Sequence, residues 1–317
     1  RGFHKDLGPE RHNIDREKPE EHLFARSLDG GETWTIEDPS GDGILTARGD
    51  LHGIVPEYSN LKPPRNLTKP INFTHPDFAM TLRMTDIHKG PSLFYYSYDR
   101  GKTWDGPFNL IVGDLTKIAA RTDYIVESEN ECYLFLTAAK TDDREGRPFC
   151  ARTVDGGLTW EFIGWIDENP QGFSIMPSTV RLSANVLLTA VRRRDGHNRW
   201  IETYLSKDNG VSWTFFNKPM PEIGEGNPPS LIKLTDGRLC LTYGYRAEPY
   251  SIRAQLSSDN GTTWSAPIFL RTDGAGRDIG YVRSVQRPDG KIVSVYYFQD
   301  HLAPERYIAA TIWSAGK

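Results

Sequence analysis

The chain has 317 residues and a formal net charge of −4, with 38 Lys and Arg residues against 42 Asp and Glu residues. No basic stretch indicates nucleic-acid binding, and no apolar run is long enough to span a membrane. Three cysteines, Cys132, Cys150 and Cys240, are too few for a disulfide framework. Cys132 and Cys150 fall on neighbouring strands of one repeat and could pair, but two buried thiols are expected. A chain of this length can bury a large core as one domain.

Residues 1–21 are polar and turn-like, and the first regular feature follows them. It is an eight-residue pattern, Ser/Thr-x-Asp-x-Gly-x-Thr/Ser-Trp, that occurs five times along the chain. The copies are 27–34, 97–104, 153–160, 206–213 and 257–264, and successive copies start 70, 56, 53 and 51 residues apart. A repeat with this spacing favours one small antiparallel sheet per copy, with the sheets arranged as a β-propeller.

Each copy lies between two short apolar runs, so it is expected to be the turn between two outer strands of a blade. The Asp accepts backbone N–H bonds across the turn, the Gly supplies a positive φ, and the Trp packs inward. Five aspartates used in the same way indicate a folding device rather than five catalytic acids. They are Asp29, Asp99, Asp155, Asp208 and Asp259.

A second kind of hairpin precedes most copies, which predicts blades of four strands. These inner hairpins cover 124–138, 178–192, 229–245 and 282–298. The last repeat has an inner hairpin and a third strand (307–313) but no eight-residue pattern, and the first has the pattern without an inner hairpin. We therefore expect one all-β domain over 1–317, a six-bladed propeller whose first blade is incomplete because the sequence begins part-way through the natural protein. Segment 40–74 is expected to be an insertion over one face.

Charged residues gather in the loops that lead into the inner strands and in those that join the second strand of a blade to the third. Such loops converge on one face of a propeller, where a central pocket is expected. The loops into the inner strands carry Arg121, Asp123, Glu222, Glu225, Arg277, Asp278 and Tyr281, and the other set carries 4–15, 192–195, Tyr245, Arg246, Asp300 and His301.

The eight-residue pattern is the Asp-box, and the chain resembles the sialidase (neuraminidase) superfamily over nearly its whole length. Segment 280–290 is similar to the sialidase strand that carries the tyrosine nucleophile, which implies this role for Tyr281. Segment 187–192 is similar to the strand that ends in the second arginine of the substrate-binding triad, which implies that role for Arg192. The third arginine would be Arg246 or Arg253.

The same resemblance places the acid/base aspartate before the first Asp-box, where Asp15 is the best candidate, with Asp6 and Glu10 behind it. Sialidases pair the tyrosine with a glutamate at the start of the fourth inner strand, but here that segment is Phe-Ser-Ile-Met-Pro (173–177). Asp278 is the substitute candidate for the missing base. Arg283, together with Arg192 or Arg246, would favour the phenolate of Tyr281.

The resemblance implies an exo-acting glycoside hydrolase that removes a terminal, acidic sugar from glycans, with Tyr281, Asp15 and Asp278 as catalytic candidates. Candidate substrate-binding residues are Arg192, Arg246, Arg283, Arg121, Asp123, His12 and His301. A polysaccharide lyase acting on uronate-containing glycans is an alternative, with His12, His52, His75, His301, Tyr281 and Arg283 as candidate groups. A non-catalytic glycan-binding propeller is a third interpretation.

No motif indicates a cofactor or a metal site, and neither nucleic acid nor a membrane is an expected partner. The resemblance implies an extracellular or periplasmic location, and the oligomeric state stays open.

Overall fold

The computed structural model describes residues 23–37, 62–302 and 305–316, and these form twenty β-strands and no helix. The candidates Asp15 and His12, with Asp6 and Glu10, lie outside the described residues, as do residues 40–61 of the expected insertion. The chain divides into two compact units. The first contains Trp34–Glu145 and Cys150–Ile163 with residues from Arg1–Ser27, and the second contains Leu28–Thr33, Gly146–Phe149 and Gly164–Lys317.

Every sheet is an up-and-down antiparallel meander in which each strand pairs with the next along the chain. The sheets that begin in the first half of the chain are β1–β2 (Phe24–Arg26, Thr35–Glu37), β3–β5 (Ala79–Met84, Ser92–Ser97, Asp105–Asn109) and β6–β9 (Tyr124–Val126, Cys132–Ala139, Glu145–Thr153, Glu161–Trp165).

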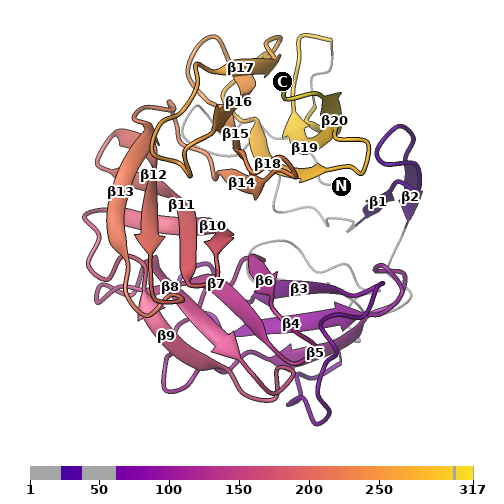
Figure 1. Cartoon of the computed structure of the whole chain (residues 1–317), viewed down its shortest axis with the longest axis vertical. Helices are drawn as coiled ribbons and strands as arrows, with labels where there is room; N and C mark the ends of the chain where they lie inside the picture. Colours follow the sequence, from indigo (N-terminus) through magenta and orange to yellow (C-terminus); the bar gives the residue numbers. More distant parts are fainter. Residues whose placement is uncertain (1–22, 38–61, 303–304, 317) are drawn as a thin grey trace. The chain divides into compact units, whose positions relative to one another are not determined.

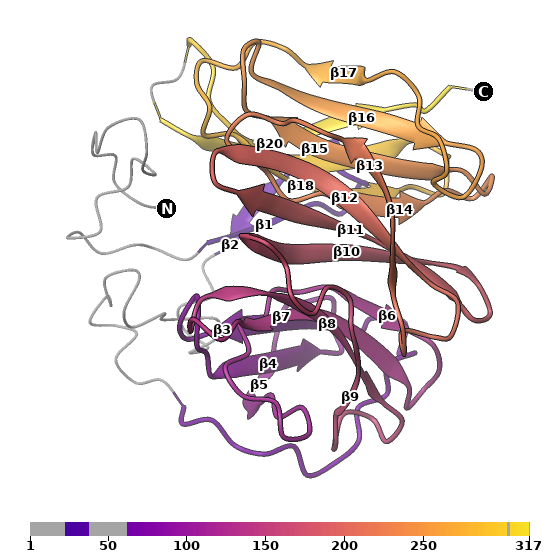
Figure 2. The same cartoon turned by 90° about the vertical axis from the view of Figure 1, so that its left-hand side faces the viewer.

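The second unit contains three complete sheets, which follow one another in chain order in Figures 1 and 2. They are β10–β13 (Phe173–Ser183, Val186–Asp195, Asn198–Ser206, Thr214–Met220), β14–β17 (Ser230–Lys233, Leu239–Tyr245, Ser251–Ser257, Ile268–Arg271) and β18–β20 (Gly280–Gln286, Ile292–Phe298, Tyr307–Trp313). The first strands of neighbouring sheets contact one another, β10 with β14 and β14 with β18.

These meanders are the blades of an all-β propeller, so the predicted fold class is confirmed. Five sheets have three or four strands, one fewer than the six blades predicted, and the two-stranded sheet β1–β2 corresponds roughly to the incomplete first blade. That the whole chain is a single domain, and that residues 40–74 are an insertion over one face, stay predictions.

The Asp-box forms the turn before the last strand of each sheet that has one, as predicted. In the fourth copy the Oδ1 of Asp208 accepts the backbone N–H of Ser212 at 2.9 Å, and Ser206 Oγ donates to the same oxygen at 2.9 Å. Ser206 Oγ in turn accepts the N–H of Gly210, whose φ is +89°. The indole of Trp213 donates to the Gly210 carbonyl at 3.0 Å. The other four aspartates accept backbone N–H bonds within their own turns in the same way.

Apolar side chains fill the spaces between neighbouring sheets of the second unit. Ile201, Leu231 and Tyr243 belong to one buried cluster between β10–β13 and β14–β17. Serine hydroxyls add cross-links at the first strands: Ser178 Oγ accepts the N–H of Leu231 at 2.9 Å, and Ser230 Oγ accepts the N–H of Ser284 at 3.1 Å. Each sheet is therefore joined to the next by both apolar contact and a hydrogen bond, which fixes where its loops project.

Candidate active site

The candidate site is built around the start of β18, where the backbone has an unusual conformation. Gly280 has a φ of +114° and Tyr281 a φ of +52°, a region that non-glycine residues seldom adopt. Asn227, fully buried in the loop before β14, holds this backbone in place. Its Oδ1 accepts the N–H groups of Tyr281 at 3.0 Å and Gly244 at 3.2 Å, and its Nδ2 donates to the Ile279 carbonyl at 3.1 Å.

The side chain of Tyr281 is 38% exposed and lies among basic and aromatic groups. Arg192, at the far end of β11, donates from Nη1 to the Tyr281 hydroxyl at 3.4 Å. The guanidinium carbon of Arg246 lies 5.7 Å from the Tyr281 ring centroid, and the ring of Tyr297 lies at the same centroid distance with an interplanar angle of 40°. Among the described residues no carboxylate hydrogen-bonds the Tyr281 hydroxyl. The phenol is therefore set beside two guanidinium groups, without the carboxylate partner that the sialidase pattern implies.

Arg246 is buried at the end of β15 and is fixed from three sides. Its Nε donates to the Ile279 carbonyl at 2.8 Å, and its Nη2 donates to the Tyr297 hydroxyl and lies 3.5 Å from Asp278 Oδ1. Its Nη1 makes no hydrogen bond within the described residues. Burial raises the pKa of Tyr297, and Arg246 opposes this, so Tyr297 remains a neutral donor near pH 7.

Both oxygens of Asp278 are occupied. The Tyr297 hydroxyl donates to Oδ1 at 2.7 Å, and Arg306 Nε lies 2.8 Å from Oδ2. The cluster of Arg192, Arg246, Arg306 and Asp278 has three guanidinium groups and one carboxylate, so its formal charge is +2. Such a cluster favours an anionic ligand, and a guanidinium matches a carboxylate in shape as well as in charge.

The structure brings together four of the residues that the sequence singled out: Tyr281, Arg192, Arg246 and Asp278. Arg246, rather than Arg253, is the arginine beside Tyr281. The Arg253 guanidinium instead packs over the ring of Tyr245, 3.5 Å from its centroid.

Of the other described candidates, Arg283 and His301 belong to the second unit, and Arg121 and Asp123 belong to the first. Arg283 is exposed on β18, two residues beyond Tyr281. His301 is an exposed loop residue beside Asp300, which pairs with Arg271 at 2.9 Å.

In the first unit, Arg121 Nη1 pairs with Glu145 Oε2 at 2.5 Å, and the Asp123 carbonyl accepts the N–H of Phe135 at 3.1 Å. The ion pair with Glu145 accounts for Arg121 without a ligand, whereas the bond given for Asp123 is made by its backbone and not by its carboxylate.

Three residues of the site were missed by sequence reasoning: Asn227, Tyr297 and Arg306. Tyr297 lies in an apolar strand and Arg306 in the long loop before β20, so neither has a local pattern that distinguishes it. Of the three, Asn227 alone had a sequence signal: it is a polar residue between Gly226 and two prolines, in a loop that also contains Glu222 and Glu225.

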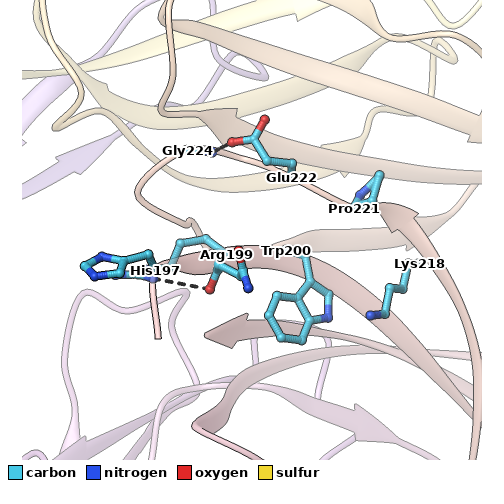
Figure 3. A pocket seen from close by; sticks show the side chains of 8 residues that line it. His197, Arg199, Trp200, Lys218, Pro221, Glu222 and Gly224 are labelled. Atoms are coloured by element: carbon cyan, nitrogen blue, oxygen red, sulfur yellow. Dashed lines mark hydrogen bonds between the residues drawn. The ribbon is translucent and has the colours of Figure 1, made fainter. Parts of the chain in front are cut away.

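A polar cavity of about 410 Å³ lies beside this site, within the second unit (Figure 3). It is lined by His197, Asn198, Arg199, Trp200, Lys218, Pro221, Glu222 and Gly224. In Figure 3 the indole of Trp200 lies next to Lys218, and Glu222 and Pro221 face them from a neighbouring segment. We call it the Trp200 pocket.

In the described part of the chain, no three His, Cys, Asp or Glu side chains gather in a way that could hold a metal ion. The three cysteines are buried and form no disulfide with one another. No helix capable of crossing a membrane occurs within the described ranges.

Comparison with known proteins agrees with this fold. A curated sialidase from Clostridium perfringens is 25% identical over 203 residues, which cover 53% of this chain and 50% of the relative. The chain thus matches about half the length of that relative. Among solved structures, a protein of unknown function from Dyadobacter fermentans has a TM-score of 0.59 at 23% identity, covering 70% of this chain and 64% of that one.

Two solved sialidases are also similar in fold. The Hadza microbial sialidase Hz136 has a TM-score of 0.58 at 18% identity, covering 91% of this chain and 58% of that one. The NanB sialidase of Streptococcus pneumoniae has a TM-score of 0.52 at 16% identity, covering 71% and 36%. Residues 56–295 match the family described as the BNR repeat-like domain. The chain belongs to this BNR repeat-like family, and its Asp-box propeller is of the sialidase-like kind.

Proposed function

We propose that the protein is an exo-acting glycoside hydrolase that removes a terminal acidic sugar from a glycan. The observation that carries the proposal is the Arg192 Nη1 contact of 3.4 Å with the Tyr281 hydroxyl, with Arg246 packed against the same ring. A carboxylate-bearing sugar bound by these guanidinium groups would have its anomeric carbon near the phenol. The likeness of the chain to sialidases supports an acidic substrate.

In the proposed reaction the Tyr281 phenol gives up its proton to solvent water, its oxygen attacks the anomeric carbon, and the bond to the leaving-group oxygen breaks. An acid, for which Asp15 is our candidate, protonates the leaving oxygen, and water then releases the sugar from the tyrosine. A tyrosine is suited to this substrate because its phenol is uncharged until the proton leaves, whereas a carboxylate nucleophile would repel the sugar carboxylate throughout. Arg192 and the Nη1 of Arg246, which makes no hydrogen bond to the described residues, would bind that carboxylate.

In this proposal Asp278 is not the base that replaces the missing glutamate of sialidases. Because Arg246, Tyr297 and Arg306 occupy its oxygens, it would hold Arg246 in position beside Tyr281. The extracellular or periplasmic location remains an inference from the family.

Product analysis on a panel of acidic glycans tests the reaction class. We expect a new reducing sugar without ultraviolet absorbance, and no product from the Tyr281→Phe protein. An unsaturated uronate that absorbs in the ultraviolet would instead identify a lyase. Binding without any product from wild-type protein would identify a glycan-binding propeller.

A further inference from the structure

We propose that the Trp200 pocket is a second sugar subsite, which binds an acidic sugar unit, carboxylated or sulfated, next to the one at Tyr281. This inference rests on the proposed function, because it takes the occupant of the pocket to be part of the same glycan that binds at Tyr281. The cavity volume of about 410 Å³ lies within the usual range of ligand pockets, roughly 300–1,000 Å³.

The pocket and the candidate active site share one wall. Ile223 donates its N–H to the Arg199 carbonyl, a pocket residue, at 3.1 Å, and its carbonyl accepts the N–H of Arg246 at 3.2 Å. The neighbouring Gly224, which lines the pocket, pairs with Arg246 in a β-bridge. A single loop backbone thus separates Arg246 from the pocket, so a glycan can occupy both without a long linker.

The indole ring of Trp200 is held in place by buried side chains. Its indole N–H donates to Glu202 Oε2 at 2.6 Å, and Glu202 is itself buried. The other Glu202 oxygen accepts from Tyr204 at 2.7 Å and pairs with Arg193 Nε at 2.9 Å. Because these contacts fix the ring before any ligand arrives, little conformational freedom is lost when a sugar packs against its edge or face.

Lys218 gives the pocket its preference for an acid. Its Nζ lies 4.7 Å from the Trp200 ring centroid and makes no ion pair within the described residues. The carboxylate of Glu222 is committed to its own loop: Oε1 accepts the N–H of Gly224 at 2.7 Å, and Oε2 accepts from Tyr245 at 3.3 Å. An anionic substituent therefore finds its donor at the ammonium group, while the Glu222 oxygens are turned towards donors of their own sheet.

Calorimetric titration of the Tyr281→Phe protein tests the pocket without turnover. The probes are galacturonic acid, galactose 6-sulfate and galactose, which distinguish carboxylate, sulfate and neutral sugars. We expect at least one acidic probe to bind about tenfold or more tighter than galactose, and Lys218→Met to abolish that preference. Lys207→Met, which removes one exposed lysine from an Asp-box turn, is the matched control and should keep it.

A companion Arg192→Met variant shows which site a probe occupies. Acid-selective binding that survives Lys218→Met but disappears in Arg192→Met would place the probe at Tyr281 and overturn the subsite. Equal binding of all three probes would overturn it as well. The proposed function fails separately, when wild-type protein releases no sugar from any acidic glycan. If wild-type protein does release a sugar, the Lys218→Met change should lower its preference for an acidic over a neutral second sugar. This preference is the ratio of the two kcat/KM values, and it should fall by about the same tenfold factor.

Discussion

Asn227 should be among the most sensitive positions in the second unit. Its side chain is fully buried and makes hydrogen bonds to the backbone of Gly244, Ile279 and Tyr281. Asn227→Ala leaves the N–H groups of Gly244 and Tyr281 without this partner in the interior, whereas the Ile279 carbonyl keeps its bond from Arg246 Nε. Each such loss costs about 1–3 kcal/mol, and because neighbouring losses are not additive we expect about 3–5 kcal/mol in total.

The same change should lower turnover more than the stability loss alone explains. Without the Asn227 bond, the Tyr281 backbone is free to leave its φ of +52°, which carries the phenol away from Arg192. Below the unfolding temperature we therefore expect kcat to fall and KM to change less. Gly280→Ala should behave similarly, because an added Cβ would lie 2.4 Å from Asn227 Nδ2 at a φ of +114°.

Urea unfolding monitored by fluorescence, with steady-state kinetics on the substrate found by product analysis, measures both effects. The control is Asn185→Ala, an exposed turn residue whose Oδ1 accepts one bond from Asn209 at 3.0 Å, for which a change within about 0.5 kcal/mol is expected. Asn227→Ala protein with the stability of the control and unaltered kcat would refute the assignment of Asn227 as the residue that positions Tyr281.

Four further outcomes are expected. Tyr281→Phe, which removes only a hydroxyl with one 3.4 Å contact, should abolish turnover while keeping ligand binding and nearly all stability; unchanged turnover would make Tyr281 structural. Asp208→Ala should cost about 1–3 kcal/mol of stability by urea unfolding and leave kcat unchanged, and loss of kcat in a stable protein would contradict the structural role. The Thr263 hydroxyl and backbone N–H lower the pKa of Asp259 to about 2, so its stabilisation is present above pH 4 and disappears as pH falls towards 2; equal pH dependence in Asp259→Asn protein would rule this out. Burial raises the pKa of the Asp167 carboxyl more than its contacts with Arg193 and the Tyr204 hydroxyl lower it, so its ionisation destabilises the native state as pH rises. Asp167→Asn should therefore be more stable than wild type at pH 8 and equal to it at pH 4, and the reverse order would show that the charge is needed.

The parts of the structure that follow local rules could be predicted from the sequence. The Asp-box turns were predictable because all their hydrogen bonds lie within eight residues, as the Asp208 turn shows. The proximity of Tyr281 and Arg192 followed from repeat geometry, which brings the start of an inner strand and the end of the next strand to the same face. What these residues do remains a proposal.

The rest of the site depends on tertiary contacts that no local pattern records. Asp278 reads as a free base in sequence, yet Arg306, from a loop 28 residues further on, occupies one of its oxygens. Tyr297 reads as an apolar strand residue because its neighbours are Val295, Tyr296 and Phe298. Only the contact of the β14–β17 sheet with the β18–β20 sheet brings its hydroxyl to Arg246.

The hydrogen bonds of Asn227 have a consequence for how activity is gained during folding. They connect a loop of the β14–β17 sheet to the start of the β18–β20 sheet, so neither sheet contains a finished site by itself. Each meander can form from contacts close in sequence, but the phenol reaches its working position only after the two sheets dock. The proposed activity should therefore report on sheet docking, and it should be lost on gentle heating before the strands themselves melt.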